Sequence, residues 1–165
     1  MTQAKINTTN VFHKAYRSST RITCLQGGTR SSKTYSLCQL FIVKCLEETG
    51  KVFTICRKTL PALKGTAYRD VLNILKELEL YTEENHNKSE LSYALNGNLI
   101  EFISVDQPQK IRGRKRNYLW LNEANEFTYE DWQQLILRTT DKIYLDYNPS
   151  DPYSWIYEKV VVRDD

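Results

Sequence analysis

A glycine-rich loop between a strand-like and a helix-like segment constrains this chain more than any other feature. The loop follows the apolar run 22–25 and precedes an apolar-rich helical stretch over 35–48. It reads Gly27-Gly28-Thr29-Arg30-Ser31-Ser32-Lys33-Thr34. A G-x-x-x-x-G-K-[ST] pattern in this setting predicts a phosphate-binding loop, in which backbone N–H groups and a helix N-terminus hold a polyphosphate.

The last residues of the loop carry the expected chemistry. We expect Lys33 to reach the β- and γ-phosphates of a nucleotide and the Thr34 hydroxyl to ligate Mg²⁺. Arg30 either stabilises charge at the γ-phosphate or is an ordinary solvent-facing loop arginine. Ser32 stands where the pattern has a second glycine, which costs about 1–2 kcal/mol if that position needs a positive φ.

Composition is compatible with one globular domain. The 165 residues are enough for a core, and a net charge of +3 permits a polyanionic partner without requiring one. No stretch approaches membrane-spanning length, so we expect no membrane association. The cysteines lack C-x-x-C spacing and fall in apolar runs, which predicts buried free thiols in a reducing cytoplasm: Cys24, Cys38, Cys45 and Cys56.

Strand-like and helix-like segments alternate after the loop, which predicts a parallel sheet covered on both faces. Asn96-Gly97-Asn98 between 91–95 and 99–103 predicts a β-hairpin. Thr128 is expected to cap a helix, with Phe127 and Trp132 placed for a hydrophobic staple. We further expect strands at 52–56, 118–121 and 142–146, an amphipathic helix ending near Leu80, a loop over 82–90, and a short helix or strand over 155–162.

Two strand ends are expected to complete the site, because ligands of open α/β sheets bind beyond the strand carboxyl ends. Asn122 follows one strand where an aspartate is usual; its amide can hydrogen-bond a metal-bound water but lacks a charge, so weak Mg²⁺ binding is expected. Glu123 is expected to activate water, or else to be a helix N-terminal carboxylate favoured by the dipole. Asn148 follows the next strand, which we expect to lie between the other two. There it senses the γ-phosphate or simply forms an Asn-Pro turn.

Basic residues gather before the Glu123 strand: Lys110, Arg112, Arg114, Lys115 and Arg116. This cluster faces DNA, lends an arginine to a neighbouring subunit's nucleotide, or is a solvated charge run. Arg114 and Arg116 are candidates for such an arginine, with no preference over Arg69 or Arg138. Arg57 and Lys58 share the ambiguity, and residues 10–16 are where we expect adenine to be recognised.

Three motifs in order resemble the large terminase subunit of tailed bacteriophages, in its N-terminal packaging ATPase. They are the loop 27–34, Asn122-Glu123-Ala124-Asn125-Glu126, and Asp146-Tyr147-Asn148-Pro149 followed by Trp155. The resemblance runs from about Thr20 to Val162, and the forms of the first two motifs are similar to a prophage-type branch. It implies a RecA-like (ASCE) P-loop ATPase fold, with a mainly parallel sheet, flanking helices and one β-hairpin, over 1–165 with a short N-terminal extension 1–19.

The resemblance also implies a function. The chain would hydrolyse ATP with Mg²⁺ to drive double-stranded DNA into procapsids in the cytoplasm of the bacterial host. Lys33 and Thr34 would bind phosphates and Mg²⁺, Arg30 would act in cis, Glu123 would be the catalytic carboxylate, and Asn148 would belong to the coupling motif. Implied partners are the portal protein, the small terminase subunit and further copies in a ring, with the isolated domain monomeric. The family's C-terminal nuclease is expected to be absent, so no nuclease activity is expected.

Two alternatives stay open. One is another RecA-like DNA-dependent ATPase, such as a helicase core stimulated by single-stranded DNA. The other is a nucleotide-binding assembly module with little or no hydrolysis, which Ser32 and Asn122 favour.

Overall fold

A seven-stranded sheet forms the centre of the computed structural model, which describes residues 6–27, 32–113, 115–148 and 155–161. The strand order is β1-β7-β6-β2-β5-β4-β3. Neighbours from β1 to β5 are parallel, whereas β4 runs antiparallel to β5 and β3 antiparallel to β4. The strands are β1 (Ile22–Gln26), β2 (Val52–Arg57), β3 (His86–Asn87), β4 (Ser92–Leu95), β5 (Asn98–Ser104), β6 (Arg116–Leu121) and β7 (Thr139–Tyr147). The predicted mainly parallel sheet is confirmed, and so is the predicted hairpin, to which β3 adds a further antiparallel strand.

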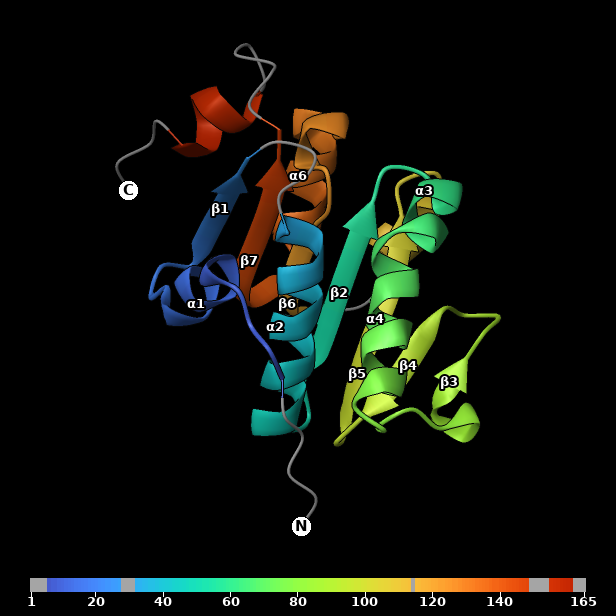
Figure 1. Cartoon of the computed structure of the whole chain (residues 1–165). Coiled ribbons are helices and arrows are strands. Elements are labelled where there is room, and N and C mark those ends of the chain that lie inside the picture. The colour runs from blue at the N-terminus through green and yellow to red at the C-terminus, as the bar shows by residue number, and fades with distance from the viewer. Residues whose placement is uncertain (1–5, 28–31, 114, 149–154, 162–165) are drawn as a thin grey trace.

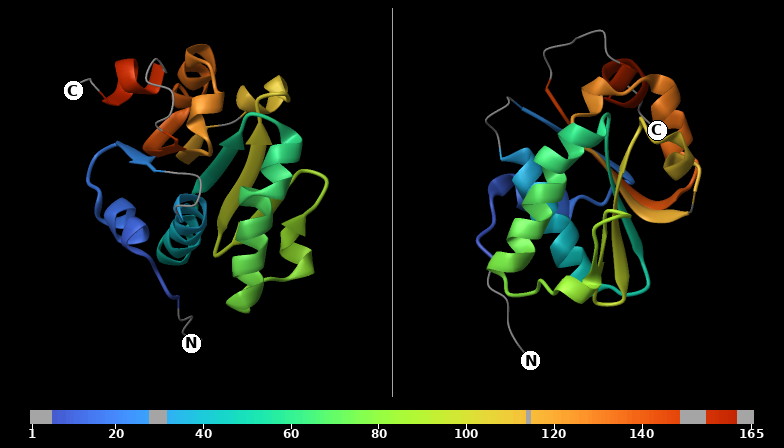
Figure 2. Two further views of the ribbon diagram at one scale, coloured as in Figure 1. Left: turned by 45° about the horizontal axis from the view of Figure 1, so that its top comes forward. Right: turned by 90° about the vertical axis from the view of Figure 1, so that its right-hand side faces the viewer.

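Helices cover both faces of this sheet (Figures 1 and 2). One face carries α1 (Asn10–Arg17), α2 (Lys33–Glu47), α3 (Leu60–Gly65) and α4 (Ala67–Glu77). The other carries α5 (Pro108–Ile111), α6 (Tyr129–Ile136) and a π-helical segment, Tyr157–Val161. Two 3₁₀ turns, Glu83–Asn85 and Ala124–Glu126, complete the described elements. The sequence did not predict α1 and α3, because helices this short depend on packing rather than on propensity.

Alternation along the strands divides the core into two layers. On β6, Tyr118 and Trp120 belong to the cluster under α2 and α4, whereas Leu119 and Leu121 belong to the cluster under α6. This follows from the two-residue period of a strand, which sends successive side chains to opposite faces. The sheet is therefore buried on both sides, as parallel sheets are.

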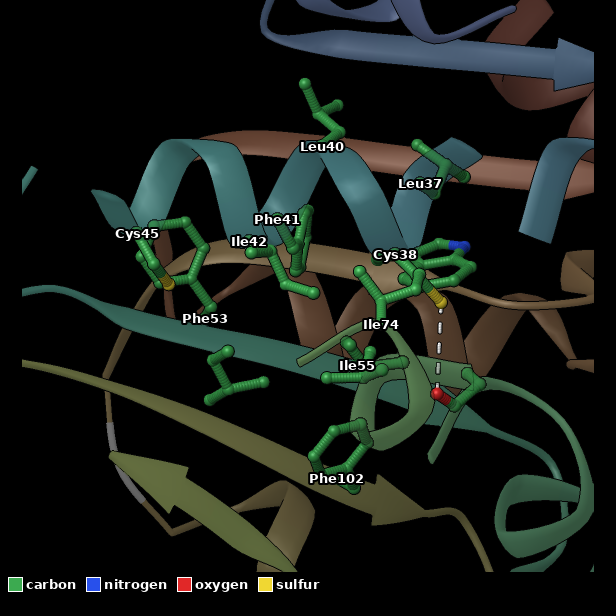
Figure 3. Packing of buried hydrophobic residues seen from close by; sticks show 14 of the residues in the cluster. Leu37, Cys38, Leu40, Phe41, Ile42, Cys45, Phe53, Ile55, Ile74 and Phe102 are labelled. Carbon is green, nitrogen blue, oxygen red and sulfur yellow. Dashed lines mark hydrogen bonds between the residues drawn. The ribbon is translucent and has the colours of Figure 1, made fainter. Parts of the chain in front are cut away.

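Helix α2 carries mostly apolar residues, and neighbouring elements bury most of its circumference. Figure 3 shows Phe41 and Ile42 on the side that faces β2, while Leu37 and Leu40 project from the other side. The Cys38 thiol donates to the carbonyl oxygen of Ala67, with the two atoms 3.8 Å apart (Figure 3). A helix that is apolar around its whole circumference is a buried one.

The cysteine prediction is confirmed in most of its detail. All four thiols are free, and Cys38, Cys45 and Cys56 are buried. Cys24 is only partly buried, because β1 lies at the edge of the sheet.

The predicted hairpin is present as β4 and β5, with Asn96 and Gly97 at φ of 53° and 77°. Positive φ at both central residues is the geometry for which Asn-Gly is the preferred sequence. The predicted loop over 82–90 is wrong in part, because β3 pairs His86 with Tyr93 and Asn87 with Ser92. Two residues are too few to leave a strand pattern in a sequence.

The segment after β6 follows the predicted capping chemistry. The Thr128 hydroxyl accepts from the Asp131 backbone N–H at 3.1 Å, and the Asp131 carboxylate accepts from the Thr128 N–H at 3.0 Å. Phe127 and Trp132 both lie in the buried cluster on this face. The described residues of 155–162 are helical, and the Trp155 indole N–H donates to the Phe127 carbonyl at 2.6 Å.

Candidate functional site

Three strand ends meet at one edge of the sheet, where β7 lies between β1 and β6 as predicted. β1 ends at Gln26 beside Gly27, β7 at Tyr147 and β6 at Leu121, and α2 begins at Lys33 (Figure 1). Because the three strands are parallel, their carboxyl ends share this edge, which is where open α/β sheets bind ligands.

Lys33 spans the ends of two strands. Its ammonium donates to the Gly27 carbonyl at 2.6 Å and to the Tyr147 carbonyl at 2.9 Å, and the residue is only 6% exposed. Ser32, just before the helix, has φ −81°, so the serine at this irregular position of the loop causes no backbone strain. Gly28, Thr29, Arg30 and Ser31 lie outside the described residues.

The side chain of Asn122 joins the loop to β7. Its Nδ2 lies 3.2 Å from the Thr34 hydroxyl oxygen and 3.0 Å from Asp146 Oδ2. Its Oδ1 accepts from the Thr66 hydroxyl at 3.3 Å. The amide therefore presents its NH₂ group to Thr34 and its oxygen to the start of α4.

Asp146 is the residue that the sequence analysis left without a role. It is completely buried, and its carboxylate also accepts from the Trp120 indole N–H at 2.5 Å and from the Glu123 backbone N–H at 3.1 Å. Burial raises the pKa of this carboxyl, while the hydrogen bonds from Asn122 and Trp120 and the charge of Lys33 oppose the rise. The sequence signal that could have found it is an acid directly after the apolar run 143–145 of β7.

Glu123 follows in an uncommon backbone conformation, at φ 54° and ψ 59°. A non-glycine residue in the left-handed region is strained, and such strain gathers at functional sites. Burial and the charge of Asp146 raise the pKa of Glu123, and Arg57 and Lys33 lower it. The lysine and the glutamate therefore lie at the same edge, within range of each other's charge.

Arg57 is tied into the flank of this site. Its Nη1 donates to the Thr66 hydroxyl at 2.9 Å, and its Nη2 to Glu126 Oε1 at 2.9 Å. Lys58 pairs with Asp131 at 3.1 Å. Both basic side chains therefore have partners within the fold.

Asn148 directly follows β7 at the same edge. Its backbone N–H lies 3.5 Å from Asn125 Oδ1, which links the third motif to the second. The residues after it, 149–154, lie outside the described residues.

The basic cluster before β6 does not act as one surface. Arg116 is 1% exposed, and its guanidinium donates to the carbonyl oxygens of Leu135 at 3.1 Å and Ile111 at 3.2 Å. The prediction that Arg116 is lent to a neighbouring subunit is therefore wrong, because this side chain of β6 is buried and bonds to α5 and α6. Arg114 lies outside the described residues.

No helix among the described residues is long and apolar enough to cross a membrane. No group of three or more His, Cys, Asp or Glu side chains gathers there as a metal site.

The fold and the meeting of three strand ends define a RecA-like α/β domain. A family model described as phage terminase large subunit matches residues 19–165. The chain therefore belongs to the phage terminase large subunit family.

Solved structures agree with this fold. The large terminase of a thermophilic bacteriophage superposes with a TM-score of 0.79 at 16% identity, over 94% of this chain and 43% of that one. The ATPase domain of the Thermus phage P74-26 large terminase gives 0.71 at 15%, over 92% and 68%. The N-terminal domain of the DNA packaging ATPase of bacteriophage phi29 gives 0.55 at 16%, over 86% and 81%.

These identities are low, so the likeness concerns the fold. The chain spans less than half the length of the first of these large terminases, which is also matched in complexes with ATP-γ-S and with ADP. No curated protein sequence matches this chain.

Proposed function

We propose that this chain is the ATPase motor domain of a phage terminase large subunit, which hydrolyses ATP to drive double-stranded DNA into procapsids. One observation carries the proposal: Lys33, Thr34 and Glu123 lie at one sheet edge, where Lys33 contacts the end of β7 and the pair Asn122–Asp146 links Thr34 to Glu123. The family membership supports a nucleotide ligand, as do the ATP-γ-S and ADP complexes of the large terminase with the TM-score of 0.79.

Phosphate binding falls to the loop 27–34 and the start of α2. The Lys33 ammonium already lies between two carbonyl oxygens at the strand ends, where it can turn to the β- and γ-phosphates. The N-terminus of a helix favours negative charge through its free N–H groups and its dipole. Arg30, within the loop but outside the described residues, is proposed to stabilise charge at the γ-phosphate.

The donor set at this edge fits Mg²⁺, which prefers hard oxygen ligands and keeps several waters. Thr34 supplies a hydroxyl oxygen, Asn122 Nδ2 lies 3.2 Å from it, and Asp146 is the next partner of the same amide nitrogen. When bound, Mg²⁺ neutralises phosphate charge. Thr34 would hold the ion directly, and Asn122 through water.

Glu123 is proposed to orient the attacking water and to take its proton. Burial raises the pKa of its carboxyl, which makes the carboxylate a stronger base. Its left-handed backbone, held by the N–H bond to Asp146, fixes where the side chain starts. Asn148, next to the Tyr147 carbonyl that Lys33 contacts, is proposed to sense the γ-phosphate.

The wider setting follows from the family. We propose that residues 1–165 form the ATPase domain, that the domain assembles as a ring on the procapsid in the host cytoplasm, and that it meets duplex DNA, the portal protein and the small terminase subunit. Isolated, it is expected to be monomeric and to lack nuclease activity.

An ATPase assay with and without duplex DNA, across a range of protein concentration, tests the proposal. Lys33→Ala should abolish Mg²⁺-dependent hydrolysis, and Glu123→Gln should abolish hydrolysis while retaining nucleotide binding. Lys64→Ala and Glu130→Gln, at exposed helix positions, are matched controls that should behave as wild type. Stimulation by single-stranded DNA alone would favour a helicase core. Nucleotide binding without phosphate release at any concentration would favour an assembly module.

A further inference from the structure

The fully buried acid at this sheet edge, Asp146, lies on β7, whereas the motif predicts an acid directly after β6. β6 is followed by Asn122, a neutral amide, where an aspartate is usual. The register pairs Leu121 of β6 with Leu145 of β7, so Asn122 and Asp146 are the next residues along two neighbouring parallel strands. Their side chains meet, with Asn122 Nδ2 lying 3.0 Å from Asp146 Oδ2 and 3.3 Å from Oδ1.

The contacts of Asp146 are those of an anion. Among the described residues, its oxygens accept from the Trp120 indole N–H, the Glu123 backbone N–H and the Asn122 amide. A protonated carboxyl would turn an O–H donor toward groups that are themselves donors. A fully buried carboxylate is costly unless it is hydrogen-bonded, and these donors offset the cost.

The carboxylate is linked to the position proposed for the metal through the Asn122 amide. The nitrogen of Asn122 that contacts Asp146 also lies 3.2 Å from the Thr34 hydroxyl oxygen. One amide group thus separates the buried charge from the hydroxyl that is proposed to hold Mg²⁺. The partners that surround a metal's direct ligands orient them and adjust their affinity.

We infer that Asp146 supplies, from β7, the negative charge for nucleotide-bound Mg²⁺ that Asn122 on β6 does not carry. It acts through Asn122 and the backbone of Glu123, and is therefore a positioning residue. The inference rests on the proposed function, because it needs a Mg²⁺–nucleotide ligand at Thr34.

The test measures ATP-γ-S binding by isothermal titration calorimetry, once in EDTA and once over a series of Mg²⁺ concentrations. Asp146→Asn should weaken the apparent affinity for Mg²⁺ about 10- to 100-fold. Its affinity for ATP-γ-S in EDTA should stay within about two-fold of wild type, which a general loss of structure would not allow. Asp141→Asn is the matched control: it removes the same charge from the other end of β7, where Asp141 pairs with Lys51 at 3.3 Å, and should leave the Mg²⁺ affinity unchanged.

Exchanging the two side chains gives the decisive variant. Asn122→Asp/Asp146→Asn keeps one carboxylate and one amide in the same place and should restore most of the Mg²⁺ affinity lost in Asp146→Asn. If Asp146→Asn fails to fold, the exchange is compared directly with wild type and should match its Mg²⁺ affinity within about ten-fold.

Wild-type Mg²⁺ affinity in a folded Asp146→Asn would overturn the inference while leaving the proposed function intact. An exchange variant that folds but binds Mg²⁺ no more tightly than Asp146→Asn would also overturn it. If Asp146→Asn does not fold, an exchange variant whose Mg²⁺ affinity is more than ten-fold below that of wild type would overturn it instead. If wild-type protein binds no ATP-γ-S in either condition, the proposed function fails, and the inference fails with it.

Discussion

Tyr144 offers a substitution that should stabilise the protein. The residue is completely buried on β7, and its hydroxyl has no hydrogen-bond partner among the described residues. Its ring packs against Phe41, with centroids 5.8 Å apart, and Phe at position 144 would keep this contact. Burying a hydroxyl without a partner costs about 1–3 kcal/mol. Tyr144→Phe should therefore raise the free energy of unfolding by about 1–2 kcal/mol.

Tyr93 is the matched control, because it is equally buried but fully bonded. Its hydroxyl donates to the Leu80 carbonyl at 2.8 Å and accepts from the Thr82 N–H at 2.9 Å. Tyr93→Phe should cost about 1 kcal/mol for the lost hydrogen bonds. The same chemical change thus has opposite signs at the two positions.

Urea unfolding followed by circular dichroism measures both variants, with the m-value checking that each unfolds like wild type. In a domain of this size, each kcal/mol shifts the melting temperature by about 2–4 °C. A Tyr144→Phe variant that is no more stable than wild type, or that falls with Tyr93→Phe, would refute the reasoning from the unpartnered hydroxyl.

Three further predictions concern the Asn96-Gly97 turn, the His86 side chain and the N-terminal cap of α6. Gly97→Ala should destabilise by about 1–3 kcal/mol in urea unfolding, because φ is 77° and an added Cβ would clash with Thr49 Oγ1. Gly50→Ala, at φ 75° with open space, should cost less, and equal costs would contradict the clash. Burial lowers the pKa of His86, so the folded state prefers the neutral ring and stability should fall as the pH drops below about 6.5. A His86→Gln variant should show a shallower loss between pH 7 and pH 5, and an unchanged slope would exclude this histidine. Thr128→Ala should cost about 1 kcal/mol and Thr128→Ser little, as thermal melts can check.

The sequence predicted those features that local chemistry decides. The loop 27–34, the Asn96-Gly97 turn and the Thr128 cap each depend on residue types at short spacing, and the last two have the expected geometry. The position of β7 between β1 and β6 was predicted from the order of the loop and the glutamate strand along the chain rather than from periodicity.

Features that depend on neighbouring elements escaped prediction. Asp146 was not predicted as a site residue because its hydrogen bond to Asn122 joins two neighbouring strands, and no residue spacing within one strand reveals such a pair. Arg116 was counted with its basic neighbours, yet it is buried and its guanidinium donates to two backbone carbonyl oxygens. A run of positive charge in a sequence does not distinguish a solvated side chain from a buried one.

The two-residue length of β3 has a consequence for self-association. An unpaired strand at the border of a sheet is a template on which another chain can add, with amyloid-like growth as the extreme case. Here β3, the last strand on the hairpin side of the sheet, exposes too little backbone to pair in register with a strand of another chain. The hairpin side of the molecule should therefore resist strand-mediated aggregation.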